Sequence, residues 1–179
     1  MAISANLALV ILEIMGLRIS IGRRKGKIFA YYTQISNLIT LLSSLSFLLG
    51  TRHATGLRFL STCMLTMTFL ITLFVLVPMG GGFRKLMLLS NGLYHHTICP
   101  ILGVASYLFL EPHDGIILLP VGVTFVYGMV MLVLNGLGRF DGPYPFFRVR
   151  QQSVAASALW IIVLTGVIAL ISFAFASIQ

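Results

Sequence analysis

The stretch NGLYHHTICP, residues 91–100, places an Asn, a Tyr and two adjacent histidines inside an otherwise apolar part of the chain. Polar and ionisable side chains at membrane depth are costly and normally face a protein interior or a cavity. A Thr hydroxyl beside a neutral imidazole can attack an ester, because the imidazole takes the hydroxyl proton. Thr33 of another apolar stretch and His95 are therefore our candidate nucleophile and general base.

Composition indicates a polytopic membrane protein. The 179 residues are 58% hydrophobic and 9% charged, whereas about 25% of a soluble domain is charged. The net charge of +8 lies in short linkers between apolar runs, which is typical of membrane topology. We therefore expect membrane lipids and no nucleic acid as partners. Cys63 and Cys99 show no metal-binding spacing, so neither a metal nor another cofactor is predicted.

Apolar runs of about 17–25 residues can cross a bilayer as helices. The sequence predicts a single all-α transmembrane domain over residues 1–179, a bundle of six membrane-spanning helices. The first run lacks a basic leader and contains Glu13, so it is expected to be a retained span and not a cleaved signal. The spans are placed at 2–18, 29–50, 57–79, 88–110, 115–137 and 153–176.

The basic residues predict the direction of the spans. Ten of the 12 Lys and Arg residues lie in the first, third and fifth linkers, while Arg52 and Arg58 are assigned to the second and the fourth has none. By the positive-inside rule, the odd-numbered linkers are cytoplasmic and both termini lie outside.

Depth brings three unusual groups together. Counted from the nearest basic residue at about 1.5 Å per residue, Glu13 lies about 8 Å, Thr33 about 9 Å and His95 about 15 Å inside the membrane. These depths differ by about one helical turn. The groups therefore share the inner half of the membrane, whereas the outer half is expected to be nearly free of polar groups.

Neighbouring polar residues extend this pattern into a predicted pocket that opens toward the inner leaflet. Thr33, Ser36 and Asn37 share one helix face, as do Asn91 and His95, and Asn135 closes the fifth span. Amide or phenol groups could donate hydrogen bonds to a developing oxyanion. The expected substrate-binding or supporting residues are Ser36, Asn37, Asn91, Tyr94, His96, Glu13 and Asn135.

Structural explanations remain open for the same residues. Thr33 could bond the carbonyl four residues back, Asn37 and Asn91 could join helices, and Glu13 could form a structural pair with a histidine. Haem ligation is disfavoured, because His95 and His96 point about 100° apart on a helix and no other span holds a histidine. A proton or ion pathway would need polar groups on both sides of the midplane.

The chain resembles the androgen-induced, FAR-17a-like transmembrane protein family, which includes threonine hydrolases of fatty acid esters of hydroxy fatty acids. The resemblance is carried by TQISNL at residues 33–38, by the N-x-x-x-H-x-x-x-x-P element within residues 91–100, and by YPF at residues 144–146. Departures from the family pattern are Gly92 and His96, which stand where family members tend to have His and Thr.

The resemblance implies a lipid-ester hydrolase without a cofactor, in a bacterial cytoplasmic membrane. Carried over, Thr33 is the nucleophile, His95 the essential histidine and Asn91 the motif Asn, and Tyr144 joins the supporting residues. The expected substrates are fatty acid esters of hydroxy fatty acids or similar acyl esters. The alternative is a membrane protein that binds a lipid or small ligand without catalysis, or a transporter.

Overall fold

The computed structural model describes residues 1–142 and 144–178, except the side chains of residues 23–27. The first linker's basic residues 23, 24, 25 and 27 therefore lie outside the described side chains. Within the described residues the chain forms helices and no strand, so the all-α prediction is confirmed. The α-helices are α1 (Ala2–Arg24), α2 (Tyr32–Leu48), α3 (Ala54–Ile71), α4 (Cys99–Leu110), α5 (Leu118–Gly136) and α6 (Val154–Ala176).

Five helical segments are long and apolar enough to cross a membrane, which is compatible with a multi-pass membrane protein. They are Ala2–Gly22, Ala54–Gly81, Leu93–Leu110, Leu118–Gly136 and Val154–Ala176. The helix of the predicted second span, α2, has 17 residues and is not among them. Its buried side chains are almost all polar, so α2 is the polar helix of the bundle.

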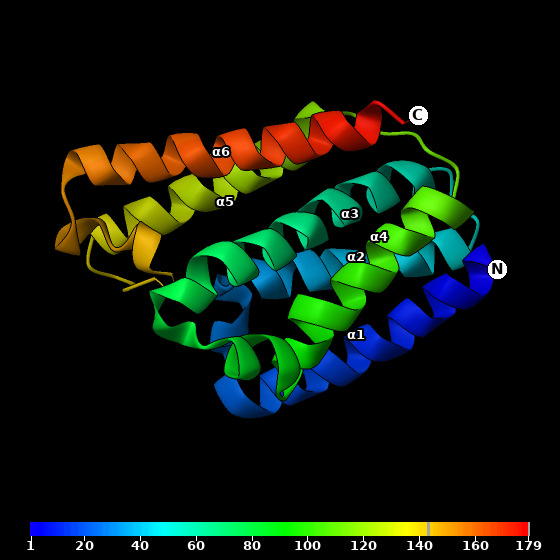
Figure 1. The fold of residues 1–179 in the computed structure, drawn as a ribbon, viewed down its shortest axis with the longest axis horizontal. Helices are drawn as coiled ribbons and strands as arrows, with labels where there is room; N and C mark the ends of the chain where they lie inside the picture. The colour runs from blue at the N-terminus through cyan, green and yellow to red at the C-terminus, as the bar shows by residue number, and fades with distance from the viewer. Residues whose placement is uncertain (143, 179) are drawn as a thin grey trace.

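The helices lie roughly side by side, with α3 in the middle (Figure 1). Helices α5 and α6 pack together on one side of α3, whereas α2 and α4 contact its other side and α1 contacts both of them. Both termini lie at one end of the bundle (Figure 1). The connections at 25–31, 82–92 and 137–153 lie at the other end, where they surround the start of α2 (Figure 1).

Several helix boundaries differ from the predicted spans. Helix α1 continues past residue 18 to Arg24, and a 3-10 helix, Lys25–Ala30, follows it directly. Helix α3 begins at Ala54 and continues as the π-helix η2, Thr72–Gly81. The predicted span 88–110 is broken near its start, because the π-helix η3, Arg84–Leu88, ends in an extended residue before a new helix begins.

Proline explains the wide turns that precede α4. The π-helix η4, Leu93–Ile98, leads into α4, and the Cys99 N–H donates to the Tyr94 carbonyl five residues back. Pro100 has no N–H to donate to the carbonyl four residues back, so the α-helical pattern fails there. A π-helical turn carries i to i+5 bonds instead of i to i+4 bonds. Both histidines of the motif therefore lie on a π-helical segment and not on an α-helix.

Glycines close the connection between η2 and η4. Gly80 and Gly82 have φ angles of +97° and +72°, which only glycine adopts at little cost. At Gly92 an added Cβ would lie 2.2 Å from the Leu86 carbonyl oxygen, so this crossing also excludes a larger residue. The connection is thereby folded back over the start of α2.

Candidate functional site

Thr33 lies in the first turn of α2, where its side chain is buried. Its Oγ is 3.2 Å from the Tyr144 hydroxyl oxygen, and its backbone N–H donates to the same oxygen at 3.3 Å. Tyr144 precedes the short 3-10 helix η5, Pro145–Phe147, in the connection between α5 and α6. Two motif residues that are 111 positions apart therefore meet in the fold.

A cavity of about 680 Å³ opens beside Thr33 and Tyr144. Ligand-binding cavities typically measure about 300–1,000 Å³, so this volume is sufficient for a small lipid-like ligand. The cavity is lined by the folded connection and by the start of α2, and it includes two more predicted residues, Asn91 and His96.

A second, apolar pocket of about 50 Å³ is also lined by Thr33. Its walls come from α3, α5, α6 and the η5 segment, and include Phe125, Phe146 and Leu164. Thr33 and Tyr144 line both spaces. The Thr33 side chain is therefore placed where a polar cavity and an apolar pocket meet.

His95 is fully buried and is not part of the cavity lining. The Gln34 amide lies 3.1 Å from its Nδ1, and its Nε2 faces a Glu13 carboxylate oxygen at 3.5 Å. When the amide donates to Nδ1, the proton of the neutral ring is on Nε2, toward Glu13. Among the described residues no hydrogen bond joins Thr33 to His95, because the Thr33 hydroxyl bonds Tyr144 instead.

The contact between Glu13 and His95 is one that depth along the helices had suggested. Gly16 leaves room for this contact because it has no side chain; a Cβ added there would lie only 2.2 Å from His95 Nε2. Neither Glu13 oxygen has a hydrogen-bond partner among the described residues. The Cys99 thiol, a weak donor, is also close enough to interact with this carboxyl.

Two predicted residues of α2 hold the Thr33 backbone. The Ser36 hydroxyl donates to the Thr33 carbonyl at 2.9 Å and also pairs with Thr68 of α3. The Asn37 amide donates to the Thr33 carbonyl at 2.6 Å and to the His95 carbonyl at 3.4 Å. Asn37 therefore fixes the start of α2 against η4, as an interhelical contact would.

Asn135 and Tyr94 are two further predicted residues that do not line the cavity. The Asn135 amide donates to the Phe140 carbonyl, and its oxygen accepts from the Arg150 N–H, so Asn135 orders the connection after α5. Tyr94 is absent from the lining of both spaces. The expectation that Asn91 and His95 share one face assumed α-helical spacing, which does not apply to the π-helical segment.

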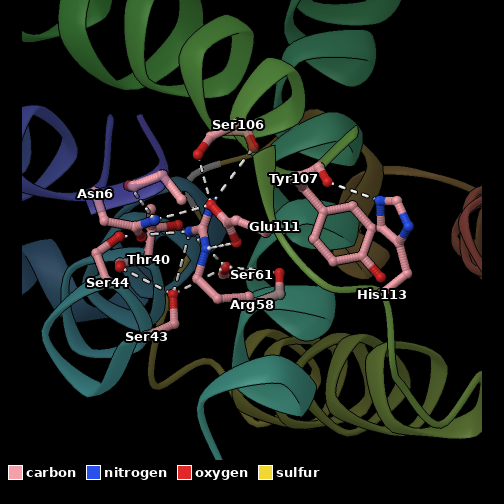
Figure 2. Close-up of polar contacts among 12 residues, drawn as sticks. Asn6, Thr40, Ser43, Ser44, Arg58, Ser61, Ser106, Tyr107, Glu111 and His113 are labelled. Carbon is pink, nitrogen blue, oxygen red and sulfur yellow. Dashed lines mark hydrogen bonds and ion pairs between the residues drawn. The ribbon is translucent and has the colours of Figure 1, made fainter. Parts of the chain in front are cut away.

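A second polar cluster, which we name the ion-pair cluster, lies at the end of the bundle that carries the termini (Figure 2). Arg58 of α3 is fully buried and binds the Glu111 carboxylate through Nε at 2.7 Å and Nη2 at 3.0 Å. Glu111 also accepts from Asn6 at 2.9 Å and from Ser106 at 2.5 Å. Weaker contacts at 3.4 Å join Arg58 to Ser43, Ser44, Ser61 and the Gly103 carbonyl.

The expectation that this half of the bundle is nearly free of polar groups was wrong. Arg58 and Glu111 were both assigned to linkers, because charged residues next to apolar runs are usually solvated. A signal was present in α2, where Thr40, Ser43 and Ser44 continue the polar face at i, i+3 and i+4 spacing.

No group of three or more His, Cys, Asp or Glu side chains in the described part of the chain could hold a metal ion. The chain matches no protein-family model, and neither the curated proteins nor the solved structures give a match.

Proposed function

We propose that the protein is an intramembrane hydrolase of acyl esters with Thr33 as the nucleophile. The observation that carries this proposal is the position of Thr33 on the wall shared by the 680 Å³ cavity and the apolar pocket. An ester that binds there can place its acyl chain in the apolar pocket and its alcohol part in the cavity. Its carbonyl carbon then lies near the Thr33 hydroxyl.

The proposed reaction has two steps. In the first, Thr33 Oγ attacks the carbonyl carbon, a histidine takes the hydroxyl proton, and the same histidine returns it to the leaving alcohol oxygen. In the second, water attacks the acyl-Thr33 ester, releasing the acid and restoring the hydroxyl. The Tyr144 hydroxyl and the Asn91 amide are positioned on the cavity wall as donors to the oxyanion.

The geometry favours His96 over His95 as the base, although the family motif matches His95. His96 lines the same cavity as Thr33, whereas His95 does not and has its ring nitrogens directed at Gln34 and Glu13. In this proposal His95 is a positioning residue. It holds Gln34, the neighbour of Thr33, through the Nδ1 contact.

Hydrolysis of a panel of lipid esters by the purified protein tests the proposal. Thr33→Ala should lower kcat/KM at least about a thousandfold, as loss of a nucleophile does, whereas Ser36→Ala on the same helix should retain most activity. A fluorophosphonate probe should label Thr33. Full turnover by Thr33→Ala, or labelling of another residue, contradicts the assignment.

The two histidines are separated by the same assay. His96→Gln should cost nearly as much as Thr33→Ala, and the double variant should lose little more, because residues that act as a unit are not additive. His95→Gln should have the smaller effect on kcat. The reverse order would return the role of base to His95.

The proposal includes α2 as a sixth membrane crossing. The basic linkers then face the cytoplasm of a bacterial cell and both termini lie outside, which agrees with their positions at opposite ends of the bundle (Figure 1). Impermeant thiol reagents should reach Arg84→Cys and Asp114→Cys from opposite sides of the membrane. The native Cys63 and Cys99 are buried. Labelling of both positions from one side would exclude this topology.

One observation favours a second function, binding of a lipid without catalysis. The Thr33 hydroxyl is hydrogen-bonded to Tyr144, and no hydrogen bond to His95 prepares it for attack. Under this alternative, an intact ester binds equally well to the natural protein and to Thr33→Ala, and neither hydrolyses it.

A further inference from the structure

The lining of the 680 Å³ cavity carries positive charge without a compensating carboxylate. Lys85 of η3 and Arg148, which follows η5, reach it from two different connections, and no Asp or Glu is among the lining residues. The ion pairs within the described part of the chain use neither cation. Ser90, Asn91 and His96 add polar groups to the same wall. The cavity is therefore suited to an anion.

The charged cavity and the apolar pocket share Thr33 in their walls. Lys85 and Arg148 line only the polar cavity, Phe125 and Leu164 line only the apolar pocket, and Thr33 lines both. A ligand that contacts the two cations, Thr33 and the apolar pocket has an anionic head, an ester and an acyl chain in that order. Glycerophospholipids have this order, since their glycerol carries the phosphate head group and is joined to each acyl chain by an ester.

We propose that the cavity selects phospholipids with a net anionic head group, whose phosphate is held by Lys85 and Arg148. A zwitterionic head group carries the same phosphate but brings a further cation to a wall that has no carboxylate to balance it. An acyl ester then lies at Thr33, and the first part of its chain enters the apolar pocket. The pocket of about 50 Å³ is small, so the rest of the chain extends into the bilayer. Cleavage of that ester rests on the proposed function, but binding of the lipid does not.

A phosphate suits these residues better than a single carboxylate does. The planar guanidinium of Arg148 can bind two phosphate oxygens at once, and the Lys85 ammonium can bind a third as a point charge. The polar side chains on the same wall can reach any remaining oxygen. A carboxylate has only two oxygens to share among these groups.

Trp160 reports on binding because it is the only tryptophan of the chain and packs against Phe146, with ring centroids 5.4 Å apart. Phe146 lines the apolar pocket. Phospholipids with bromine-labelled chains should therefore quench Trp160 fluorescence when a chain enters. In detergent, brominated phosphatidylglycerol or phosphatidate should reach half-saturation at about tenfold lower concentration than brominated phosphatidylcholine, a difference of about 1.4 kcal/mol.

Charge-removing variants test the assignment of the head-group site. Lys85→Gln and Arg148→Gln should each weaken the anionic preference about three- to tenfold, which is the range expected for contacts between a cation and a phosphate. Arg84→Gln is the matched control, because Arg84 is the adjacent cation and does not line the cavity. It should leave the preference unchanged.

Each outcome decides one of the two proposals. Equal quenching by anionic and zwitterionic lipids, or a preference that survives both charge-removing variants, overturns the proposed selection for anionic head groups by Lys85 and Arg148. A brominated fatty acid that binds as tightly as the anionic phospholipids, with the same dependence on Lys85 and Arg148, assigns the site to a carboxylate and also overturns it. A clear preference without turnover of any phospholipid leaves the binding site standing and contradicts ester hydrolysis.

Discussion

Two buried carboxylates of the bundle, Glu111 at the end of α4 and Glu13 in the middle of α1, are satisfied in very different ways. The Glu111 side chain is fully buried and accepts hydrogen bonds from Arg58, Asn6 and Ser106. Glu13 is also fully buried, but among the described residues its carboxylate accepts no N–H or O–H hydrogen bond; it faces the His95 ring at 3.5 Å and the weakly donating Cys99 thiol. Buried polar groups are normally paired, so an exception calls for an explanation. We assign Glu111 to stability and Glu13 to the site.

The surroundings of the two carboxylates agree with this division. The ion-pair cluster joins α1, α2, α3 and α4, and none of its residues lines either of the two spaces beside Thr33. Glu13, by contrast, faces His95, and His95 contacts Gln34, which lines the large cavity. The ion-pair cluster is thus a closed hydrogen-bond network, whereas Glu13 and His95 are incompletely paired and His95 lies next to a residue of the cavity wall.

The largest expected effect comes from breaking the closed network. Arg58→Met leaves the Glu111 carboxylate buried without its cation, which should lower the free energy of unfolding by about 3–5 kcal/mol. Unfolding in mixed micelles of increasing SDS content measures this change. Arg52→Met is the control, because Arg52 is exposed in the neighbouring connection. A loss below about 1 kcal/mol for Arg58→Met would mean that the network does not stabilise the bundle.

A smaller loss of stability is expected from a substitution at Gly16, which leaves space for the His95 ring. Gly16→Ala places a methyl group against the His95 ring, and overpacking of this kind costs about 1–3 kcal/mol. Gly22→Ala on the same helix is the matched control, since nothing lies within 4 Å of the added Cβ. It should change stability by less than about 0.5 kcal/mol. Similar values for the two variants would show that the His95 ring moves freely.

Tyr144→Phe removes the hydroxyl that holds the Thr33 side chain and N–H. We expect a loss of about 0.5–1.5 kcal/mol in unfolding free energy, as for an ordinary hydrogen bond. Under the hydrolase proposal, the acylation rate should fall more than substrate affinity, because the oxyanion loses a donor. Tyr94→Phe should leave both properties unchanged. An unchanged acylation rate in Tyr144→Phe would remove Tyr144 from the reaction.

The smallest change in stability is expected for Glu13→Gln, and it tests the comparison between Glu13 and Glu111 directly. Glu13→Gln keeps the shape of the side chain and weakens only the thiol contact with Cys99 and the 3.5 Å contact with His95, so it should change the free energy of unfolding by less than about 1 kcal/mol. Glu111→Gln should cost several times as much, because it leaves Arg58 without its carboxylate. Ester hydrolysis should fall in Glu13→Gln. Equal losses of stability in the two Gln variants would refute the division between the carboxylates.

The sequence predicted the features that follow from composition and depth. The helical fold came from the apolar runs, and the contact between Glu13 and His95 came from their similar distances to basic linkers. The contact between Thr33 and Tyr144 depends on how the connection after α5 folds back, which no helical periodicity describes. The shared motif named Tyr144 as a supporting residue, but the contact itself was not predicted.

Two features of the structure could not be predicted from the sequence, for physical reasons. The burial of Arg58 and Glu111 is a property of the pair, since each charge alone would be expected in solvent. Which histidine lines the cavity depends on the wide turns before Pro100, whereas the prediction used α-helical spacing. Sequence spacing therefore named the pair of histidines but did not predict the direction of either side chain.

The π-helical segment that carries both histidines also has a consequence for variation in chain length. A wider turn holds more residues than the α-helical turn that would span the same distance, so the segment can lose a residue and tighten to α-helical turns, although Pro100 would still have no N–H to donate. Such a deletion would turn the preceding residues by about 100° relative to α4. The side chain presented to the cavity is thus set by the number of residues before Pro100 as well as by their identity. Single substitutions leave that number unchanged, so only insertions and deletions can reveal its importance.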